Sequence, residues 1–152
     1  MDDFFNWVLL RRLRAEKAKK KFLDCAGSEF AEEFLKLLLR LMGLFFLLNR
    51  NFRRNIQDFK GRYLFKSRDN RITVAAVFKD KRLKVYEKEI DNTDVTITFR
   101  DSKAIMDYLL SPKPDILGSL LRQDVVINGN LNYVYKFAYM AKHLQLMATG
   151  KL

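Results

Sequence analysis

The sequence predicts an α+β fold in which a largely antiparallel sheet of about five strands is covered on one face by helices. Two observations carry this prediction. Between Gly61 and Phe99, apolar and polar residues alternate with the period of a β-strand. On both sides of this stretch, apolar residues recur at helical spacing. A sheet with one apolar face needs a cover, and the flanking helices are the segments of the chain that can supply it.

The central stretch divides into strands at short polar breaks. Asp69-Asn70 and Asp80-Lys81 interrupt the alternation, and Asp and Asn tolerate the left-handed backbone of tight turns. The residues that alternate onto the apolar face are Tyr63, Phe65, Ile72, Val74, Ala76, Phe78, Leu83, Val85, Val95, Ile97 and Phe99. The expected product is an antiparallel meander in which each strand pairs with the next.

Residues 1–48 are expected to form a hydrophobic and basic helical leader, and residues 49–152 the folded domain. Ser28, followed by Glu29, Glu32 and Glu33, is typical of a helix N-terminus, where the helix dipole favours acids. The helix that follows is apolar nearly all round from Phe34 to Leu48, and Gly43 marks a candidate kink or end. A short amphipathic helix is expected over Asn49–Lys60.

After the meander, the pattern predicts two helices, one strand and a closing helix. Lys103–Leu110 carries an apolar helical stripe, and the break at Ser111–Pro114 holds both prolines of the chain. A short helix with Ile116, Leu117, Leu120 and Leu121 comes next, then the strand Val125–Ile127 and a tight turn at Asn128–Asn130. The last helix is expected over Leu131–Met147.

Composition narrows the range of partners. The chain has 152 residues, a formal net charge of +11 and a pI of about 9.8, which favours an anionic partner: nucleic acid or an acidic membrane surface. Its single cysteine, Cys25, cannot form an intrachain disulfide, so a reducing, cytoplasmic location is expected. Asp2 and Asp3 stand where an export signal would be basic, so no export signal is expected. Lys36 and Arg40 interrupt the apolar run from Phe34 to Leu48, which is also too short to cross a membrane, so no transmembrane helix is expected there.

The sequence offers no constellation that supports catalysis. His143 is the single histidine and has no serine or cysteine motif beside it. Cysteine and histidine spacings for zinc are missing, as are the glycine-rich motifs of nucleotide sites. We therefore expect no enzyme activity, no cofactor and no bound metal.

Three stretches in order resemble the sterol carrier protein type 2 (SCP2) family. These are DVTITFRDSKAIMDYLL from Asp94 to Leu110, SLLRQDVVINGNL from Ser119 to Leu131, and the closing apolar helix. The resemblance extends over about residues 49–146 and does not reach the leader. It implies an SCP2-like α+β domain with an apolar cavity between sheet and helices, which holds a sterol, a fatty acyl chain or an isoprenoid-type lipid. Some bacterial members look like accessory factors of isoprenoid quinone synthesis, and a similar hydrophobic leader precedes their domain.

With this resemblance, strand alternation and helical stripes together select the side chains expected to line the cavity. From the sheet these are Phe65, Val74, Ala76, Phe78, Val85, Ile97 and Phe99, and from the helices Leu110, Leu117, Leu121, Phe137, Met140 and Leu144. The protein is thus expected to be a non-catalytic lipid-binding or lipid-transfer protein. An alternative within this class is an accessory factor that presents lipid intermediates to quinone-biosynthesis enzymes at the membrane surface.

The leader leaves several interpretations open. Its first helix can pack on the domain or anchor the protein peripherally to an anionic membrane, and its apolar second helix can join another copy in a homodimer or dip into the membrane. The residues expected at the membrane are Phe4, Phe5, Trp7, Arg11, Arg12, Arg50, Arg53 and Arg54. The alternative from another class is a basic nucleic-acid-binding protein, which is not expected because the strands lack a ribonucleoprotein-type aromatic motif.

Overall fold

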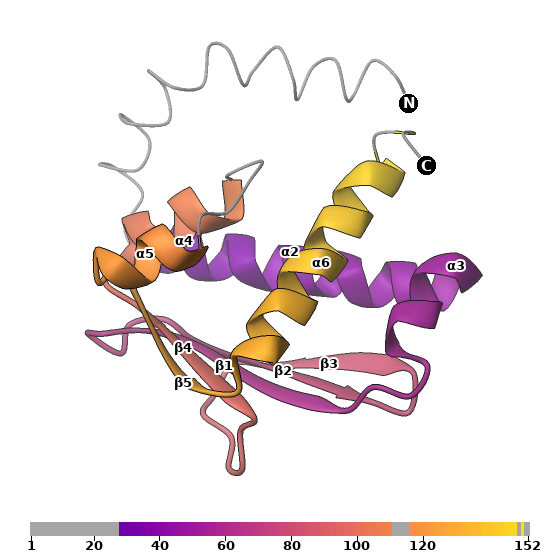
Figure 1. Ribbon diagram of the computed structural model, residues 1–152, viewed down its shortest axis with the longest axis horizontal. Coiled ribbons are helices and arrows are strands. Elements are labelled where there is room, and N and C mark those ends of the chain that lie inside the picture. The colour runs from indigo at the N-terminus through magenta and orange to yellow at the C-terminus, as the bar shows by residue number, and fades with distance from the viewer. Residues whose placement is uncertain (1–27, 111–115, 149, 151–152) are drawn as a thin grey trace.

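The computed structural model describes residues 28–110, 116–148 and 150, and it shows one five-stranded sheet with the helices gathered on one face (Figure 1). The strands are β1 (Gly61–Ser67), β2 (Thr73–Lys79), β3 (Arg82–Tyr86), β4 (Val95–Phe99) and β5 (Val125–Gly129). The helices are α2 (Ser28–Leu48), α3 (Arg50–Arg53), the 3-10 turn η1 (Arg54–Ile56), α4 (Ser102–Leu110), α5 (Ile116–Leu121) and α6 (Leu131–Ala148). The predicted fold class is confirmed.

The first three strands form the expected antiparallel meander. β1 pairs with β2, and β2 pairs with β3, both antiparallel. Asp80 and Lys81, which join β2 to β3, both have positive φ, +54° and +60°. Two consecutive left-handed residues follow the right-handed twist of the strands they connect, which is why such turns close hairpins. The hairpin predicted at Asp80-Lys81 is therefore confirmed.

The predicted meander is wrong for β4. The strand order is β3-β2-β1-β4-β5, and β4 lies beside β1 in parallel. To reach that position, residues 87–94 cross the sheet on the face opposite the helices. Lys66 Nζ lies 3.8 Å from Glu89 Oε1, and Arg62 Nε donates to the backbone oxygen of Asp91 at 3.0 Å. Alternation shows which face a side chain occupies, but it does not show which strand lies alongside.

Helix α2 belongs to the core of the domain. Its fully buried residues are Ala31, Leu35, Leu39, Met42 and Phe46. They join the same hydrophobic cluster as the strand residues, and the helix lies over β2 and β3. α2 also continues unbroken through Gly43. α2 and the strands therefore share one hydrophobic core.

Aromatic side chains fill the layer between sheet and helices. Phe46 on α2 stacks on Phe52 with ring centroids 4.5 Å apart, and the ring of Phe65 lies 5.1 Å from that of Phe137 on α6. Tyr63 donates its hydroxyl hydrogen to the backbone oxygen of Tyr133 at 2.7 Å. Burial of that hydroxyl raises the pKa of Tyr63 above its ordinary value. The heavy aromatic content of the sequence thus serves, in large part, the packing of one core.

Candidate functional site

The strand residues predicted to line a cavity all face the helices. Phe65, Val74, Ala76, Phe78, Ile97 and Phe99 are buried, and Val85 is half-buried at β3. From α6, Phe137, Met140 and Leu144 are buried against them. The contact between Phe65 and Phe137 joins the two layers directly. Around these rings the space between sheet and helices is filled by side chains.

On α5, the predicted orientation is wrong. Leu117 is 61% exposed and Leu121 is 86% exposed, whereas Ile116 is buried. The helix has two apolar pairs four residues apart, Leu117 with Leu121 and Ile116 with Leu120. The spacing therefore fits either face of this short helix. The structure places Ile116 and Leu120 inward. The side chain of Leu110, also predicted at the cavity, lies outside the described part of the chain.

A small hollow remains where five elements meet. It has a volume of about 10 Å³ and lies between β4, β5, α4, α5 and α6, over which α4 and α5 form a cover (Figure 1). Its lining residues are Ile97, Tyr108, Ile116, Ser119, Val125, Ile127 and Val134. A hollow of this size has room for about one water molecule. The described side chains that line this hollow would therefore have to move apart to admit an acyl chain.

Tyr108 is the unusual member of this lining. Its hydroxyl oxygen is buried and has no hydrogen-bond partner among the described residues. Its ring lies 5.7 Å from that of Phe99. Burial raises the pKa of Tyr108 from its ordinary value of 10.0 to about 12. A tyrosine hydroxyl is protonated at neutral pH with either value and can donate a hydrogen bond. Buried polar groups are rarely left unpaired, which makes this hydroxyl a candidate ligand contact.

Of the residues that line the hollow, only Ile97 belongs to the set predicted from the sequence. The alternation of Val125 and Ile127 along β5 was a signal that could have identified two more. Tyr108 and Ser119 gave no comparable signal, because a hydroxyl within an apolar helical stripe fits a surface position equally well.

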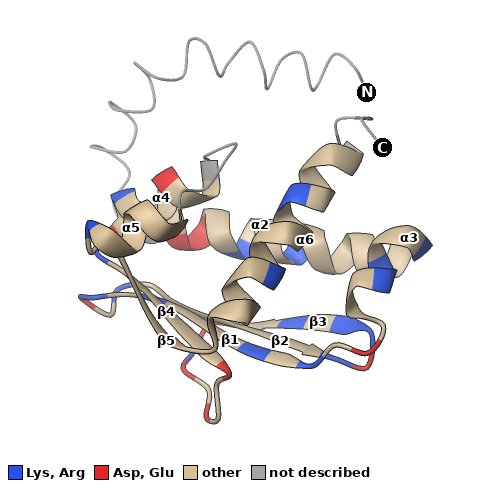
Figure 2. Ribbon diagram, viewed as in Figure 1, with Lys and Arg blue, Asp and Glu red and all other residues tan. Residues whose placement is uncertain are grey.

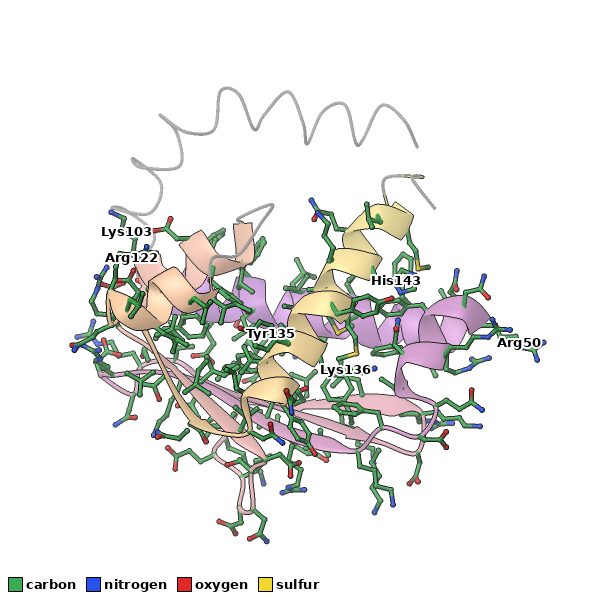
Figure 3. The ribbon with its side chains drawn as sticks, viewed as in Figure 1. Arg50, Lys103, Arg122, Tyr135, Lys136 and His143 are labelled. Carbon is green, nitrogen blue, oxygen red and sulfur yellow. The ribbon has the colours of Figure 1, made fainter. Side chains whose placement is uncertain are left out.

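A second hollow lies at the opposite end of the sheet. It has a volume of about 410 Å³, opens to solvent and is lined by Gln57, Asp58, Phe59, Lys60, Asp80 and Lys81. The Lys136 ammonium lies 5.4 Å from the centre of the Phe59 ring. Figure 3 shows Lys136 on α6. Four of its six lining residues are charged and it is open to solvent, so it does not enclose an apolar ligand as a buried cavity would.

The predicted membrane-contact residues Phe4, Phe5, Trp7, Arg11 and Arg12 lie outside the described residues. Arg50 and Arg54 are exposed near the end of α2, and Figure 3 shows Arg50 extending away from the domain. Arg53 is partly engaged elsewhere: its Nη1 donates to the backbone oxygens of Phe46 and Leu47 at 3.2 and 3.1 Å. It thus caps the C-terminus of α2, where carbonyl groups lack helical partners.

One surface of α2 carries a stripe of exposed leucines, which we call the leucine stripe. It consists of Leu37, Leu41, Leu44 and Leu48, spaced three or four residues apart, with Leu47 beside them. Contiguous exposed apolar residues are uncommon on isolated soluble domains and mark contact surfaces. The stripe ends next to the exposed Arg50.

The contacts of His143 are those of a packed side chain. Its Nδ1 accepts a hydrogen bond from the Asn55 side-chain amide at 2.8 Å, and its ring lies 5.3 Å from that of Phe52.

Within the described ranges, no group of three or more His, Cys, Asp or Glu side chains is arranged to hold a metal ion. In that same part of the chain, no helix combines the length and the apolar character needed to cross a membrane.

Comparison with known proteins shows which solved structures have a similar arrangement of strands and helices. No protein-family model matches the sequence, and no curated protein matches it significantly. Among solved structures, a ubiquinone synthesis protein described as UbiJ-SCP2 aligns with a TM-score of 0.55 and 14% identity over 78% of this chain and 94% of that one. The sterol carrier protein domain 2 of Helicoverpa armigera aligns with a TM-score of 0.51 and 20% identity over 77% of this chain and 88% of that one. The chain therefore has the fold of the sterol carrier protein 2 domains, as its sequence pattern predicted.

Proposed function

We propose that the protein is a non-catalytic lipid-binding protein that holds its ligand between the sheet and the α4–α5 cover. The observation that carries this proposal is the hollow at the meeting point of β4, β5, α4, α5 and α6, whose lining is aliphatic apart from Tyr108 and Ser119. The surface of this hollow is apolar, and the hydroxyls of Tyr108 and Ser119 contribute none of it. An apolar surface of this kind is typical of sites for small apolar ligands. The likeness to sterol carrier protein 2 folds supports the same class of ligand.

The ligand has to open this site, and of the two helices that cover it α5 is the shorter. Ile116, at 9% exposed, is its one buried residue, Leu120 is partly buried, and Leu117 and Leu121 are exposed already. Displacing six residues that bury so little apolar surface costs little, and each CH₂ group of the entering lipid recovers about 0.8 kcal/mol. The aromatic layer around Phe65 and Phe137 would stay in place and form the floor beside the ligand.

We also propose that the ligand is exchanged at an anionic membrane surface, which the leucine stripe contacts. Leu44, Leu47 and Leu48 would enter the interfacial region, with Arg50 and Arg54 at the lipid phosphates. Figure 2 shows Lys and Arg residues on α3 close to this end of α2. A homodimer formed through the stripe is the competing explanation for its exposure.

A narrower alternative is that the protein presents lipid intermediates to the enzymes of quinone synthesis. The observation in its favour is the structural match to a protein described as acting in ubiquinone synthesis. Nucleic-acid binding is the competing function from another class, because the net charge of +11 suits phosphates as well as lipid head groups.

Native mass spectrometry of the full-length protein after purification tests the lipid proposal. We expect an additional mass in the range of an acyl, sterol or isoprenoid lipid, which organic extraction removes. A parallel measurement with delipidated protein and a fluorescent fatty-acid analogue should show saturable binding. If neither preparation binds lipid while an oligonucleotide binds tightly at physiological salt, the protein is a nucleic-acid binder instead.

A further inference from the structure

The Tyr108 hydroxyl is a buried donor without an acceptor among the described residues. Such a group loses its hydrogen bonds to water on folding and gains none in return, so it destabilises the empty protein. A phenylalanine at this position would keep the ring contact with Phe99 and remove the unpaired group. The hydroxyl therefore lowers the stability of the empty protein, and the packing of the ring does not explain why a tyrosine stands at this position.

The surroundings of the hydroxyl restrict what could pair with it. The residues that share the hollow with Tyr108 are aliphatic, except for Ser119, and none of them carries a charge. A carboxylate buried there would lack a cation to compensate its lost hydration, which is costly in an apolar site. A neutral oxygen, such as a carbonyl, ester or hydroxyl oxygen, can accept the hydrogen bond without this penalty.

We infer that Tyr108 is a ligand-orienting residue, which donates a hydrogen bond to a neutral oxygen at the buried end of the bound lipid. This inference rests on the proposed lipid-binding function and specifies its ligand class. The lipid enters with its oxygen-bearing end toward α4, and its hydrocarbon part lies along Ile97, Ile127 and Val134. A tyrosine hydroxyl is protonated at neutral pH, so it is available as a donor.

The test compares the parent protein with Tyr108→Phe, using three probes that share a long saturated chain: a methyl ketone, an alkane and a fatty acid at pH 8. Affinities are measured by displacement of a fluorescent lipid, and stabilities of the delipidated proteins by thermal unfolding. For the parent, we expect the ketone to bind most tightly. In Tyr108→Phe, we expect ketone affinity to fall about tenfold and alkane affinity to stay unchanged.

The same substitution should raise the midpoint of thermal unfolding of the empty protein by about 2–4 °C, because the unpaired hydroxyl is gone. This opposite effect on stability and on ketone affinity separates a ligand contact from a structural role. Tyr135→Phe is the matched control: Tyr135 is 44% exposed on α6 (Figure 3), and neither quantity should change.

Two results would overturn the inference while leaving the lipid-binding proposal intact. One is that Tyr108→Phe binds all three probes as the parent does. The other is that the substitution lowers the unfolding midpoint, which would mean that the hydroxyl already has a partner in the empty protein. Failure of the parent to bind any of the probes would instead overturn the proposed function itself.

Discussion

Lys36 on α2 forms an ion pair with Glu87, which directly follows β3: Lys36 Nζ lies 2.9 Å from Glu87 Oε1. Lys36 is only 5% exposed, and its ammonium group also pairs with Glu33. The aliphatic part of the lysine packs within the domain while its charge is satisfied at the rim. The ion pair explains why a charged residue can stand on the buried side of an apolar helix. It also links α2 to the edge of the sheet.

The first prediction concerns the pH dependence of this pair. The hydrogen bond from Lys36 and its positive charge hold the pKa of Glu87 below its ordinary value of 4.5. A carboxyl whose pKa is lowered by folding stabilises the protein above about pH 4.5, and this contribution disappears as pH falls through the folded-state pKa. Glu87→Gln should therefore unfold at a lower temperature than the parent at pH 7, and this difference should shrink as the pH falls below 4.5 towards 3.

Glu89→Gln serves as the control for this measurement. Glu89 is exposed and lies 3.8 Å from Lys66, so its loss should change the unfolding midpoint little at either pH. An equal loss of stability in Glu87→Gln at pH 3 and pH 7 would contradict the role assigned to the ion pair.

The second prediction separates the two parts of the expected leader. Deleting residues 1–48 should prevent folding, because Leu35, Leu39, Met42 and Phe46 complete the core over β2 and β3. Deleting residues 1–27 should leave a folded protein, since every element of the described sheet and its cover is retained. Circular dichroism and thermal unfolding measure both. A cooperative unfolding transition in the protein that lacks residues 1–48 would show that α2 is dispensable.

The third prediction contrasts two apolar residues that the sequence pattern treats alike. Phe137→Ala should destabilise the protein by about 3–5 kcal/mol, because it leaves a cavity beside Phe65 in the packed core. Leu121→Ala should change the free energy of unfolding by less than about 0.5 kcal/mol, since Leu121 is exposed. Chemical denaturation measures both values. Similar losses for the two variants would mean that Leu121 packs inward in solution.

The fourth prediction concerns the turn between β5 and α6. Gly129 has φ of +122°, and a Cβ atom there would clash with the backbone oxygen of Asp94. Gly129→Ala should therefore destabilise the protein by more than about 1 kcal/mol, through the strained backbone and the clash at the start of β4. Asn128→Ala, at the neighbouring exposed position, is the control and should have a small effect. Equal effects in denaturation would contradict the assigned turn geometry.

The fifth prediction tests the leucine stripe as a membrane surface. Leu44→Glu with Leu48→Glu should reduce sedimentation with anionic vesicles at least tenfold at moderate salt and leave the fold intact, because both leucines are exposed. Leu117→Glu with Leu121→Glu is the matched control, exposed on α5. Analytical ultracentrifugation of the parent distinguishes the alternative occupant. If the stripe variant binds vesicles normally but dissociates a parent dimer, the stripe is a homodimer interface.

Much of the local structure follows from the amino-acid sequence alone. The alternation through Tyr63, Phe65, Val74 and Phe78 correctly identified the buried face of the sheet, because successive side chains of a strand must point to opposite faces. The polar break at Asp80-Lys81 correctly located a hairpin, because its backbone conformation is a local property. The order of elements, together with the stretches from Asp94 to Leu110 and from Ser119 to Leu131, resembled the fold that the structural matches support.

Three further features depend on contacts between distant parts of the chain, which no local pattern contains. β4 lies beside β1 because residues 87–94 cross beneath the sheet, and strand partners depend on contacts distant in sequence. α5 turns Ile116 rather than Leu117 inward, because a short helix with apolar residues on both sides has no preferred face until a neighbour covers one. Tyr108 lines a hollow where five elements meet, and its hydroxyl is buried without a partner among the described residues. No pattern within a single element can show how five elements meet.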